Sequence, residues 1–278
     1  MLTTRPLTET FGVEVLDLDI ARATEDELRA IEDIYDHYNV VLLRNQNLTA
    51  AAMMAFSERF GAVEPQLRNG PHPEFPGISV LTNKAVAGKP MGVHRAGMRW
   101  HTDGTTMDRP GLTTVLYGIE VPDEGGDTLL ADARAAFNSL PEAKQRELEQ
   151  IKAVHSLAYL IENQPYRPTI LSEEERAGMP VVEHPIVLTG RDGQKSFYLT
   201  LGSTRGIVGM SDEEGREFMA DLVAYATQDQ FVYRHKWQAG DVLIWNDVCT
   251  LHCATLYDDS RFDRLVYRTW IRPVADAA

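Results

Sequence analysis

The stretch Gly240-Asp-Val-Leu-Ile-Trp245, followed by Asn246-Asp247 and Val248-Cys-Thr-Leu-His252, decides the fold of this chain. Both apolar runs are too short for a helix but have the length and composition of β-strands. Similar runs lie on either side, at Phe231–His235 and Leu265–Ile271. Four short strands separated by turn residues indicate that the C-terminal part of the chain is mainly β.

The same pattern continues toward the N-terminus as far as residue 112, and helices interrupt it. The strands expected here are Leu112–Glu120, Asp127–Leu130, Pro185–Thr189 and Ser196–Leu201, the last two joined by an Arg-Asp-Gly-Gln hairpin turn at 191–194. The helices expected are one from Pro141 to about Ile151 and one from a Ser211/Glu214 capping box to about Gln228. Many short strands with a few helices predict a β-sandwich or jelly roll that carries helices.

The first hundred residues alternate strand and helix signals. The expected strands are Phe11–Ile20, Val40–Leu43 and Ile78–Leu81, and the expected helices are Thr24 to Tyr38 and Thr49 to Phe60. Two irregular, proline-containing segments, about 66–99 and 162–180, are predicted lid loops, since long loops in compact domains are usually functional. Because no linker or repeat is visible, we expect residues 1–278 to form a single domain.

Composition and charge limit the classes of partner. The 278 residues are 44% hydrophobic and 24% charged, as in globular proteins, and no apolar run is long enough to span a bilayer. The N-terminus lacks the apolar stretch of a secretory signal, so a cytoplasmic location is expected. The net charge of −14 argues against nucleic acid and anionic membranes but not against a small anion in a pocket that contains arginine. Cys249 and Cys253 are expected to be free thiols.

The most informative cluster for chemistry is Trp100-His101-Thr102-Asp103-Gly104. If this segment is extended, the side chains of His101 and Asp103 point to the same face and can converge. Two histidines and one carboxylate form the facial triad of non-haem iron(II) oxygenases. That sparse ligand set leaves three positions open, two for a 2-oxo acid and one for dioxygen. A lone His-x-Asp is common by chance, so the second histidine must be found independently.

Local sequence alone does not identify that second histidine. His252 ends an apolar run, but four others have equally bland contexts: His94, His155, His184 and His235. The choice of His252 depends on Arg264 and Arg268, which follow it.

Arg264 and Arg268 are four residues apart, so on one strand they share a face and can point into one pocket. Two buried guanidinium groups are costly unless each meets an anion, and arginine binds carboxylates through two parallel hydrogen bonds. In the alternative reading they are surface or ion-paired arginines, with Asp258, Asp259 and Asp263 as partners.

At these residues the sequence resembles the taurine dioxygenase / 2,4-dichlorophenoxyacetate dioxygenase family of iron(II)- and 2-oxoglutarate-dependent oxygenases. The likeness covers nearly the whole chain and depends on several motifs in one order. These are Val40–Gln46, Phe56–Gly61, Trp100–Asp103, Val121–Thr128, Ala226–Trp237, Gly240–His252 and Arg264-x-x-x-Arg268. The part from Ala226 to Trp245 is more similar to the chlorophenoxyacetate branch.

The resemblance implies a double-stranded β-helix core (jelly-roll, cupin-like) with flanking helices. The residues that match the family's iron ligands are His101, Asp103 and His252. Thr128 and Arg264 match the residues that bind 2-oxoglutarate, and Arg268 matches the position that binds the substrate's anionic group. The implied enzyme is an iron(II)-dependent dioxygenase. It uses 2-oxoglutarate and O2 to oxidise a small carboxylate or sulfonate, most simply by hydroxylation, and releases succinate and CO2. A homo-oligomer is also expected from the family.

Two departures from the family pattern are visible. Trp245 is followed by Asn246-Asp247 where the family usually has Asp-Asn, which should alter a turn or a contact behind a ligand rather than a ligand. His252 is followed by Cys253-Ala254, which predicts a less polar rim. Because Asp103 is present, the halogenases that lack this carboxylate are disfavoured.

Other residues are weaker candidates for contact with the substrate, each with a packing or loop role as the alternative: His94, Arg95, Met98, Tyr159 and Ser203. Three other functions remain open at this stage. The same metal centre could desaturate or cyclise a small metabolite. A divalent-metal jelly-roll enzyme could work without 2-oxoglutarate. A non-enzymatic jelly roll could bind a small anion through its arginines.

Overall fold

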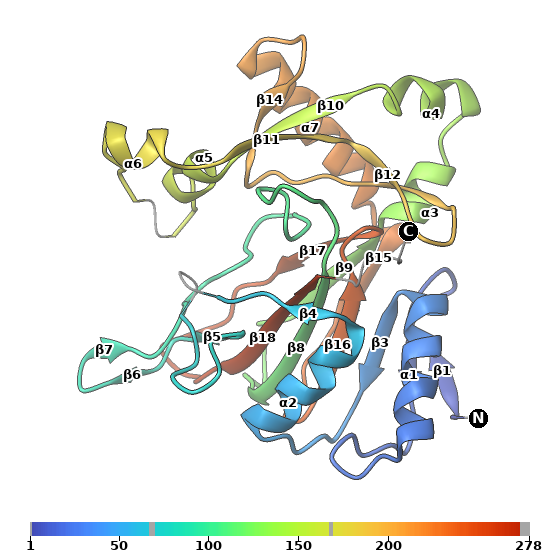
Figure 1. Cartoon of the computed structure of the whole chain (residues 1–278), viewed down its shortest axis with the longest axis vertical. Helices are drawn as coiled ribbons and strands as arrows, with labels where there is room; N and C mark the ends of the chain where they lie inside the picture. The colour runs from blue at the N-terminus through green and yellow to red at the C-terminus, as the bar shows by residue number, and fades with distance from the viewer. Residues whose placement is uncertain (1, 67–69, 167–168, 273–278) are drawn as a thin grey trace.

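The computed structural model describes residues 2–66, 70–166 and 169–272, and two antiparallel-rich β-sheets form its centre (Figure 1). The larger sheet has eight strands in the order β1-β2-β3-β16-β8-β18-β4, with β5 also paired to β18. Its strands are β1 (Thr4–Pro6), β2 (Val13–Val15), β3 (Val40–Leu43), β4 (Ala62–Val63), β5 (Ile78–Thr82), β8 (Thr113–Glu120), β16 (Val242–Asn246) and β18 (Leu265–Arg272).

The smaller sheet has the order β15-β9-β17 and lies against the inner face of the larger one. Its strands are β15 (Val232–His235), β9 (Thr128–Asp132) and β17 (Thr250–Ala254). Three further pairings lie outside these two sheets. They are β11 (Val181–Pro185)-β10 (Lys152–Ser156)-β14 (Thr204–Ile207), β12 (Val187–Thr189)-β13 (Lys195–Phe197) and β6 (Ala85–Val86)-β7 (Lys89–Pro90).

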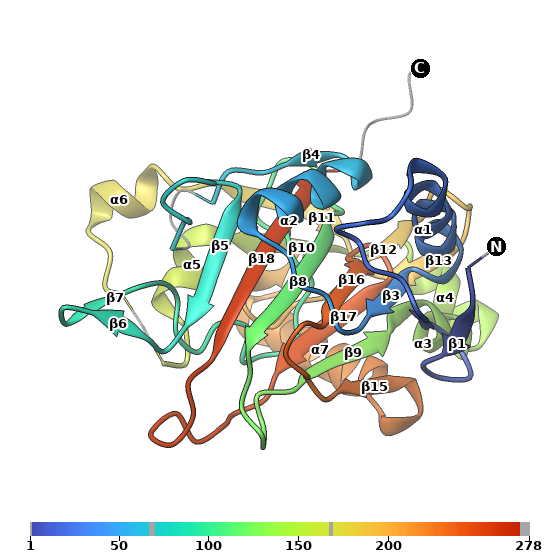
Figure 2. The same cartoon turned by 90° about the horizontal axis from the view of Figure 1, so that it is seen from below.

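Helices flank the sheets, with α1 and α2 packed on the larger sheet and α3 and α7 packed on the smaller one (Figure 2). They are α1 (Glu25–Tyr38), α2 (Ala50–Ser57), α3 (Ala133–Asn138), α4 (Glu142–Leu148), α5 (Leu157–Glu162), α6 (Glu173–Ala177) and α7 (Asp212–Ala226), with short 3-10 turns η1 (Glu58–Phe60) and η2 (Asp229–Phe231). None of the helices in the described residues is both long and apolar enough to cross a membrane. A mainly β fold with flanking helices, built from two facing sheets, confirms the predicted jelly-roll class.

Strand β3 shows why both faces of the large sheet are buried. Its four residues are 0% exposed, and alternate side chains point to opposite faces. Val41 and Leu43 join the core beneath α1 and α2, whereas Val40 and Leu42 join the core between the two sheets. The second of these cores forms the floor on which the functional pocket is built.

Several sequence predictions are confirmed at the level of single residues. Strand β3 has the predicted bounds, and α1 and α7 begin with the predicted capping boxes at Thr24 and Ser211. The hairpin predicted at 191–194 joins β12 to β13. Both cysteines are free, with Cys249 buried.

Other predictions need correction. The strand expected at Phe11–Ile20 is reduced to β2, because positive φ angles at Gly12 and Asp17 interrupt the extended backbone on each side. The two predicted lids, 66–99 and 162–180, contain residues 67–69 and 167–168, which lie outside the described residues. Their described parts are less irregular than predicted, since the first contains β6 and β7 besides the expected strand β5, and the second contains α6.

Candidate metal centre and active site

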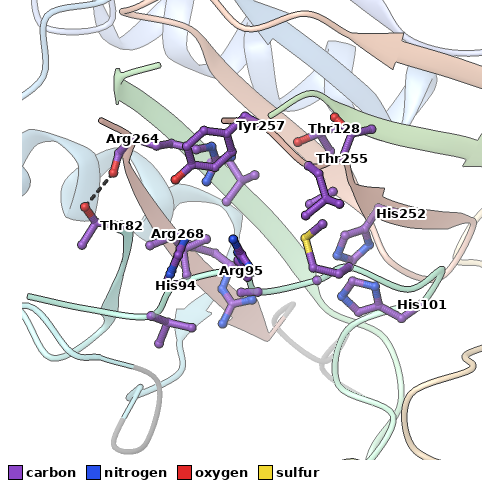
Figure 3. Close-up of a pocket in the computed structure, with 18 of the residues that line it drawn as sticks. Thr82, His94, Arg95, His101, Thr128, His252, Thr255, Tyr257, Arg264 and Arg268 are labelled. Atoms are coloured by element: carbon purple, nitrogen blue, oxygen red, sulfur yellow. Dashed lines mark hydrogen bonds between the residues drawn. The ribbon is translucent and has the colours of Figure 1, made fainter. Parts of the chain in front are cut away.

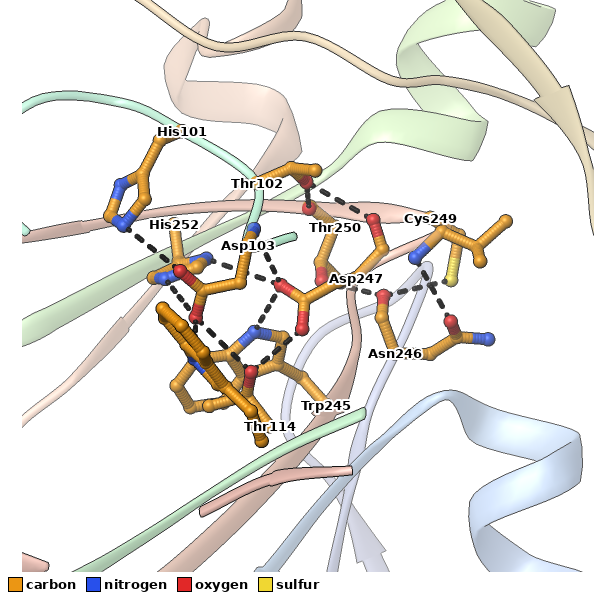
Figure 4. Close-up of polar contacts among 12 residues, drawn as sticks. His101, Thr102, Asp103, Thr114, Trp245, Asn246, Asp247, Cys249, Thr250 and His252 are labelled. Carbon is orange, nitrogen blue, oxygen red and sulfur yellow. Dashed lines mark hydrogen bonds and ion pairs between the residues drawn. The ribbon is translucent and has the colours of Figure 1, made fainter. Parts of the chain in front are cut away.

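His101, Asp103 and His252 converge at one edge of the smaller sheet (Figure 4). The backbone of His101 pairs with His252 of β17 through two hydrogen bonds, His101 N–H to His252 O at 3.0 Å and the reverse at 2.7 Å. The prediction that His101 to Asp103 form an extended strand is wrong. Only His101 pairs, and the chain then turns at Asp103 and Gly104, where φ is +79°. The two carboxylate oxygens of Asp103 lie beside the imidazoles of His101 and His252.

The geometry of the three side chains fits a divalent metal ion. One ligand atom from each lies within 4.8 Å of the others. His101 Nε2 is 3.7 Å from Asp103 Oδ1, and His252 Nε2 is 3.5 Å from Asp103 Oδ2. The other ring nitrogen of His101 lies 2.7 Å from the carbonyl oxygen of Arg99, which fixes the ring with Nε2 toward the site. Two imidazole nitrogens and one carboxylate oxygen on one side of an open pocket form the donor set of a facial triad.

Electrostatics favour the protonation states that bind metal. Burial, followed by the neighbouring His252, lowers the pKa of His101 to about 4. Burial alone would raise the pKa of Asp103, but the nearby His252 and Arg268 outweigh it and hold that pKa below its usual range. Neutral imidazole at His101 and ionised carboxylate at Asp103 are the forms that ligate a metal.

Asp247 lies directly behind the candidate ligands and is 0% exposed. Its Oδ1 accepts hydrogen bonds from Trp245 Nε1 at 3.0 Å and from the backbone N–H of Asp103 at 3.2 Å. Its Oδ2 accepts from the Thr114 hydroxyl at 2.7 Å. Burial and the charge of Asp103 raise the pKa of Asp247 to about 7.

The neighbouring Asn246 shapes the turn that leads to His252. Its side-chain oxygen accepts from Val248 N–H, and its carbonyl accepts from Cys249 N–H and the Thr250 hydroxyl. This turn delays β17 to Thr250, two residues later than the strand predicted from Val248. The inverted Asn-Asp pair thus builds a turn and contacts behind the ligands, as the sequence suggested.

A pocket opens beside the metal cluster, between the inner faces of the two sheets (Figure 3). Its apolar walls include Leu81, Val93, Leu116 and Trp245. Most of the candidate residues lie around it: His94, Arg95, Met98, His101, Thr128, His252, Arg264 and Arg268.

Arg264 and Arg268 enter this pocket without acidic partners among the described residues. The Nε atom of each is buried and has no hydrogen-bond partner. The three aspartates considered as partners pair with other cations: Asp258 with Arg261, Asp259 with His94 and Arg95, and Asp263 with Lys84. The ion-paired reading of these two arginines is therefore wrong.

Burial lowers the pKa of Arg264 to about 10, which still leaves the guanidinium charged at neutral pH. The pKa of Arg268 is also lowered by burial, against the opposing fields of Asp103 and Asp247. Two charged, half-buried guanidinium groups in an otherwise apolar pocket favour an anionic ligand.

Thr128 occupies the opposite wall, at the start of β9. Its hydroxyl oxygen accepts a hydrogen bond from Trp237 Nε1 at 3.0 Å. Because the indole can only donate, the hydroxyl proton of Thr128 remains free to donate to a ligand in the pocket. Sequence reasoning missed Trp237, although it lies within a motif that carries the family resemblance.

At the pocket mouth, His94 and Arg95 are tied to Asp259. His94 Nε2 lies 3.0 Å and Arg95 NH2 lies 2.6 Å from the same carboxylate oxygen. The guanidinium of Arg95 also stacks over the ring of Tyr166 at 5.1 Å. The loop before the metal motif is thus joined to two distant segments of the chain, one at Asp259 and one at Tyr166.

Two candidates lie away from this pocket. Tyr159 lines a separate concavity with Arg99 and Arg216. Ser203 is 0% exposed, and its hydroxyl lies 2.8 Å from Thr105 Oγ1 and 3.1 Å from His155 Nδ1. Neither is among the residues that line the pocket beside the metal cluster.

Two facing sheets with a His-Asp-His cluster in the wall of the pocket between them define the class of cupin-like non-haem metal enzymes. A family model described as "Taurine catabolism dioxygenase TauD, TfdA family" matches residues 3–270. The chain belongs to this family and is a 2-oxoglutarate-dependent dioxygenase, an oxidoreductase.

Known proteins match over nearly the full length. The chain is 31% identical over 270 residues to the alpha-ketoglutarate-dependent 2,4-dichlorophenoxyacetate dioxygenase of Cupriavidus pinatubonensis, with 92% of each protein covered. It is 31% identical over 275 residues to the pentalenolactone F synthase of Streptomyces arenae, covering 93% of this chain and 91% of that protein. The crystal structure of AAD-2 in complex with Mn(II) and N-oxalylglycine matches with a TM-score of 0.81 at 29% identity, with 100% of both chains covered.

Proposed function

We propose that this dioxygenase oxidises a small organic anion at an iron(II) ion held by His101, Asp103 and His252. The observation that carries the proposal is the convergence of these three side chains on a pocket that also contains two unpaired guanidinium groups. A metal ion bound by these ligands would provide the redox chemistry. The two guanidinium groups would bind the two anions, the cosubstrate and the substrate.

The cosubstrate 2-oxoglutarate would be held at its distal carboxylate by Arg264 and Thr128. Arg264 is fixed through its backbone, since its N–H donates to Asn83 Oδ1 at 2.9 Å and its carbonyl accepts from the Thr82 hydroxyl at 2.6 Å. Thr128 has a hydroxyl proton free for a ligand, because Trp237 already donates to its oxygen. Bound iron(II) would supply the chelation site for the 2-oxo acid group and the site of O2 activation. The electrons that reduce O2 would come from 2-oxoglutarate, which is oxidised to succinate and CO2, and from the substrate.

The substrate is proposed to be a small carboxylate or sulfonate with an apolar body. Arg268 provides the charge for its anionic group, and Leu81, Val93 and Leu116 provide apolar surface around the rest. His94, Arg95 and Met98 are further candidates for contact because they line the same pocket. A relative is named for action on 2,4-dichlorophenoxyacetate, an anion of this kind.

Hydroxylation is the proposed reaction at the substrate carbon. If that carbon bears oxygen, nitrogen or sulfur, the hydroxylated product collapses and the bond breaks. The role of the chain's own residues is to orient the substrate and exclude water from the pocket. Three predictions from the sequence are kept as part of the proposal, namely a single domain over residues 1–278, a homo-oligomer and a cytoplasmic location.

The test is an anaerobic titration of the iron(II)-loaded protein with 2-oxoglutarate, followed by the weak visible metal-to-ligand charge-transfer band. We expect a band in the native protein and a strongly weakened one in Arg264→Ala. Arg261→Ala is the matched control, because Arg261 is exposed and pairs with Asp258 outside the pocket. Absence of the band despite measured iron binding would overturn the proposed cosubstrate site.

A further inference from the structure

Strand β18 presents Arg268 and Trp270 on the face that looks toward the metal cluster. The alternate residues of this strand face the other way. Tyr267 and Ile271 belong to the core beneath α1 and α2, and Thr269 Oγ1 lies 2.8 Å from Ser57 Oγ. Trp270 Nε1 donates a hydrogen bond of 2.6 Å to Asp103 Oδ2. A tryptophan 167 residues away in sequence therefore holds the single carboxylate of the candidate ligand set.

The two oxygens of Asp103 have different surroundings. Oδ2 accepts from Trp270 and lies 3.5 Å from His252 Nε2. It is also 3.2 Å from the Thr114 hydroxyl, whose shorter contact of 2.7 Å is with Asp247 Oδ2. Oδ1 faces His101 Nε2 at 3.7 Å, and among the described residues it has no hydrogen-bond donor. A charge-assisted N–H···O bond is stronger and shorter than a neutral one, so Trp270 restrains Oδ2, while the lone pairs of Oδ1 stay available to a metal.

The same indole lies beneath Arg268. The guanidinium carbon of Arg268 is 4.1 Å from the centroid of the Trp270 ring, within the range of a cation–π contact. Among the described residues the Nε atom of Arg268 has no hydrogen-bond partner, so the ring of Trp270 supports a guanidinium that is otherwise free to meet a ligand at this nitrogen. One side chain thus contacts both the arginine proposed for the substrate anion and the carboxylate proposed for the metal.

We propose that Trp270 is a positioning residue that holds Asp103 with one oxygen toward the metal and connects that carboxylate to Arg268. The inference rests on the proposed function, because it concerns the same metal and substrate sites. If Asp103 bound through both oxygens, it would occupy a position that the facial triad leaves for 2-oxoglutarate or O2. An anion bound to Arg268 changes the charge directly above the ring that makes the 2.6 Å contact.

The test is binding of Co(II) to the metal-free protein, followed by calorimetry and by the visible spectrum of the bound ion, neither of which requires turnover. Trp270→Phe keeps a ring beneath Arg268 but removes the N–H donor. We expect roughly 10- to 100-fold weaker Co(II) binding and an altered Co(II) spectrum, the range usual for loss of a residue that supports a metal ligand. Trp237→Phe is the matched control, because it removes an indole donor from Thr128 rather than from Asp103.

Native affinity and an unchanged Co(II) spectrum in Trp270→Phe would overturn the role of Trp270. A native protein that binds no Co(II) would instead refute the metal site of the proposed function, so the two failures are distinguishable.

If Trp270→Phe does not fold, the native protein labelled with 15N-tryptophan provides a second measurement. The chain has four tryptophans, and single Phe variants of Trp100, Trp237 and Trp245 leave the fourth indole signal assigned to Trp270. We expect that signal to shift on addition of Zn(II) and again on addition of methanesulfonate, with the second shift lost in Arg268→Gln. A Trp270 signal that moves with neither addition contradicts the inference.

Discussion

Replacing His155 by asparagine should flatten the dependence of folding stability on acidic pH. His155 is 0% exposed, its Nδ1 lies 3.1 Å from the Ser203 hydroxyl, and its Nε2 has no hydrogen-bond partner among the described residues. Burial, followed by the nearby His184, lowers its pKa from 6.5 to about 3. The folded protein therefore keeps this ring neutral where an exposed histidine would be charged.

The sign follows from proton binding. Between about pH 6.5 and about pH 3 the unfolded chain binds a proton at His155 that the folded chain does not, so stability is full above this window and falls as pH falls through it. At about pH 5 the unfolded value lies roughly 1.5 pH units above the solution pH, which corresponds to about 2 kcal/mol of lost stability. For a protein with a typical stability of about 5–15 kcal/mol this loss is easily measured.

Urea unfolding of the metal-free protein at about pH 7.5, 6 and 5 measures the effect. In His155→Asn the introduced amide replaces the Nδ1 contact with Ser203, and the missing half of the ring costs roughly 1–3 kcal/mol at every pH. The diagnostic quantity is therefore the fall in the free energy of unfolding between about pH 7.5 and pH 5. This fall should be about 2 kcal/mol smaller in the variant than in the native protein. His37→Asn, at an exposed histidine, shows how much belongs to any histidine substitution. Parallel curves for the native protein and His155→Asn would refute the reasoning.

Three further predictions concern the active site. Asp247→Asn should keep the metal affinity within about threefold, because the amide oxygen can accept from Trp245 and the amide nitrogen can donate to the Thr114 hydroxyl. Asp247→Ala removes both contacts and should lower the free energy of unfolding in urea by about 2–4 kcal/mol. Arg268→Gln should raise the KM for an anionic substrate roughly 10- to 100-fold, measured as succinate release, and leave the 2-oxoglutarate charge-transfer band in place. Removal of metal by a chelator should lower the Tm, and added Mn(II) should restore it in proportion to ln(1 + [metal]/Kd), a recovery that His252→Ala should abolish.

Local signals in the sequence were sufficient for much of the fold. The capping boxes at Thr24 and Ser211 act within one helical turn, and the β3 run is apolar on both faces, so neighbouring residues contain the necessary information. The candidate ligands were also accessible, because His-x-Asp lies in one short motif and the arginine pair pointed to His252. Short elements such as α3 and β14 were missed, since a few residues carry too little periodicity to be recognised.

Contacts made over long sequence separations could not be predicted in this way. Thr102 and Asp103 contact Asp247 across 145 and 144 residues of sequence, and nothing near Asp247 distinguishes it from a turn aspartate. The strand assumed through His101 to Asp103 is limited to an isolated bridge at His101, after which the chain turns at Asp103 and Gly104. The pairing of His101 with His252 depends on the tertiary fold and could not be predicted from the local sequence.

Tryptophan side chains hold several of the polar groups around the site in place. Three of the four tryptophans donate their indole N–H to an acceptor in the pocket wall, in the metal cluster or behind it: Trp237 to Thr128, Trp270 to Asp103 and Trp245 to Asp247. An indole nitrogen can only donate, so each contact fixes the orientation of its acceptor without competing for the ligand. The large apolar ring also excludes water around that contact, which strengthens it. The pocket proposed to bind two small anions beside a metal needs polar groups held in one orientation within apolar walls, and rigid aromatic donors meet both requirements at once.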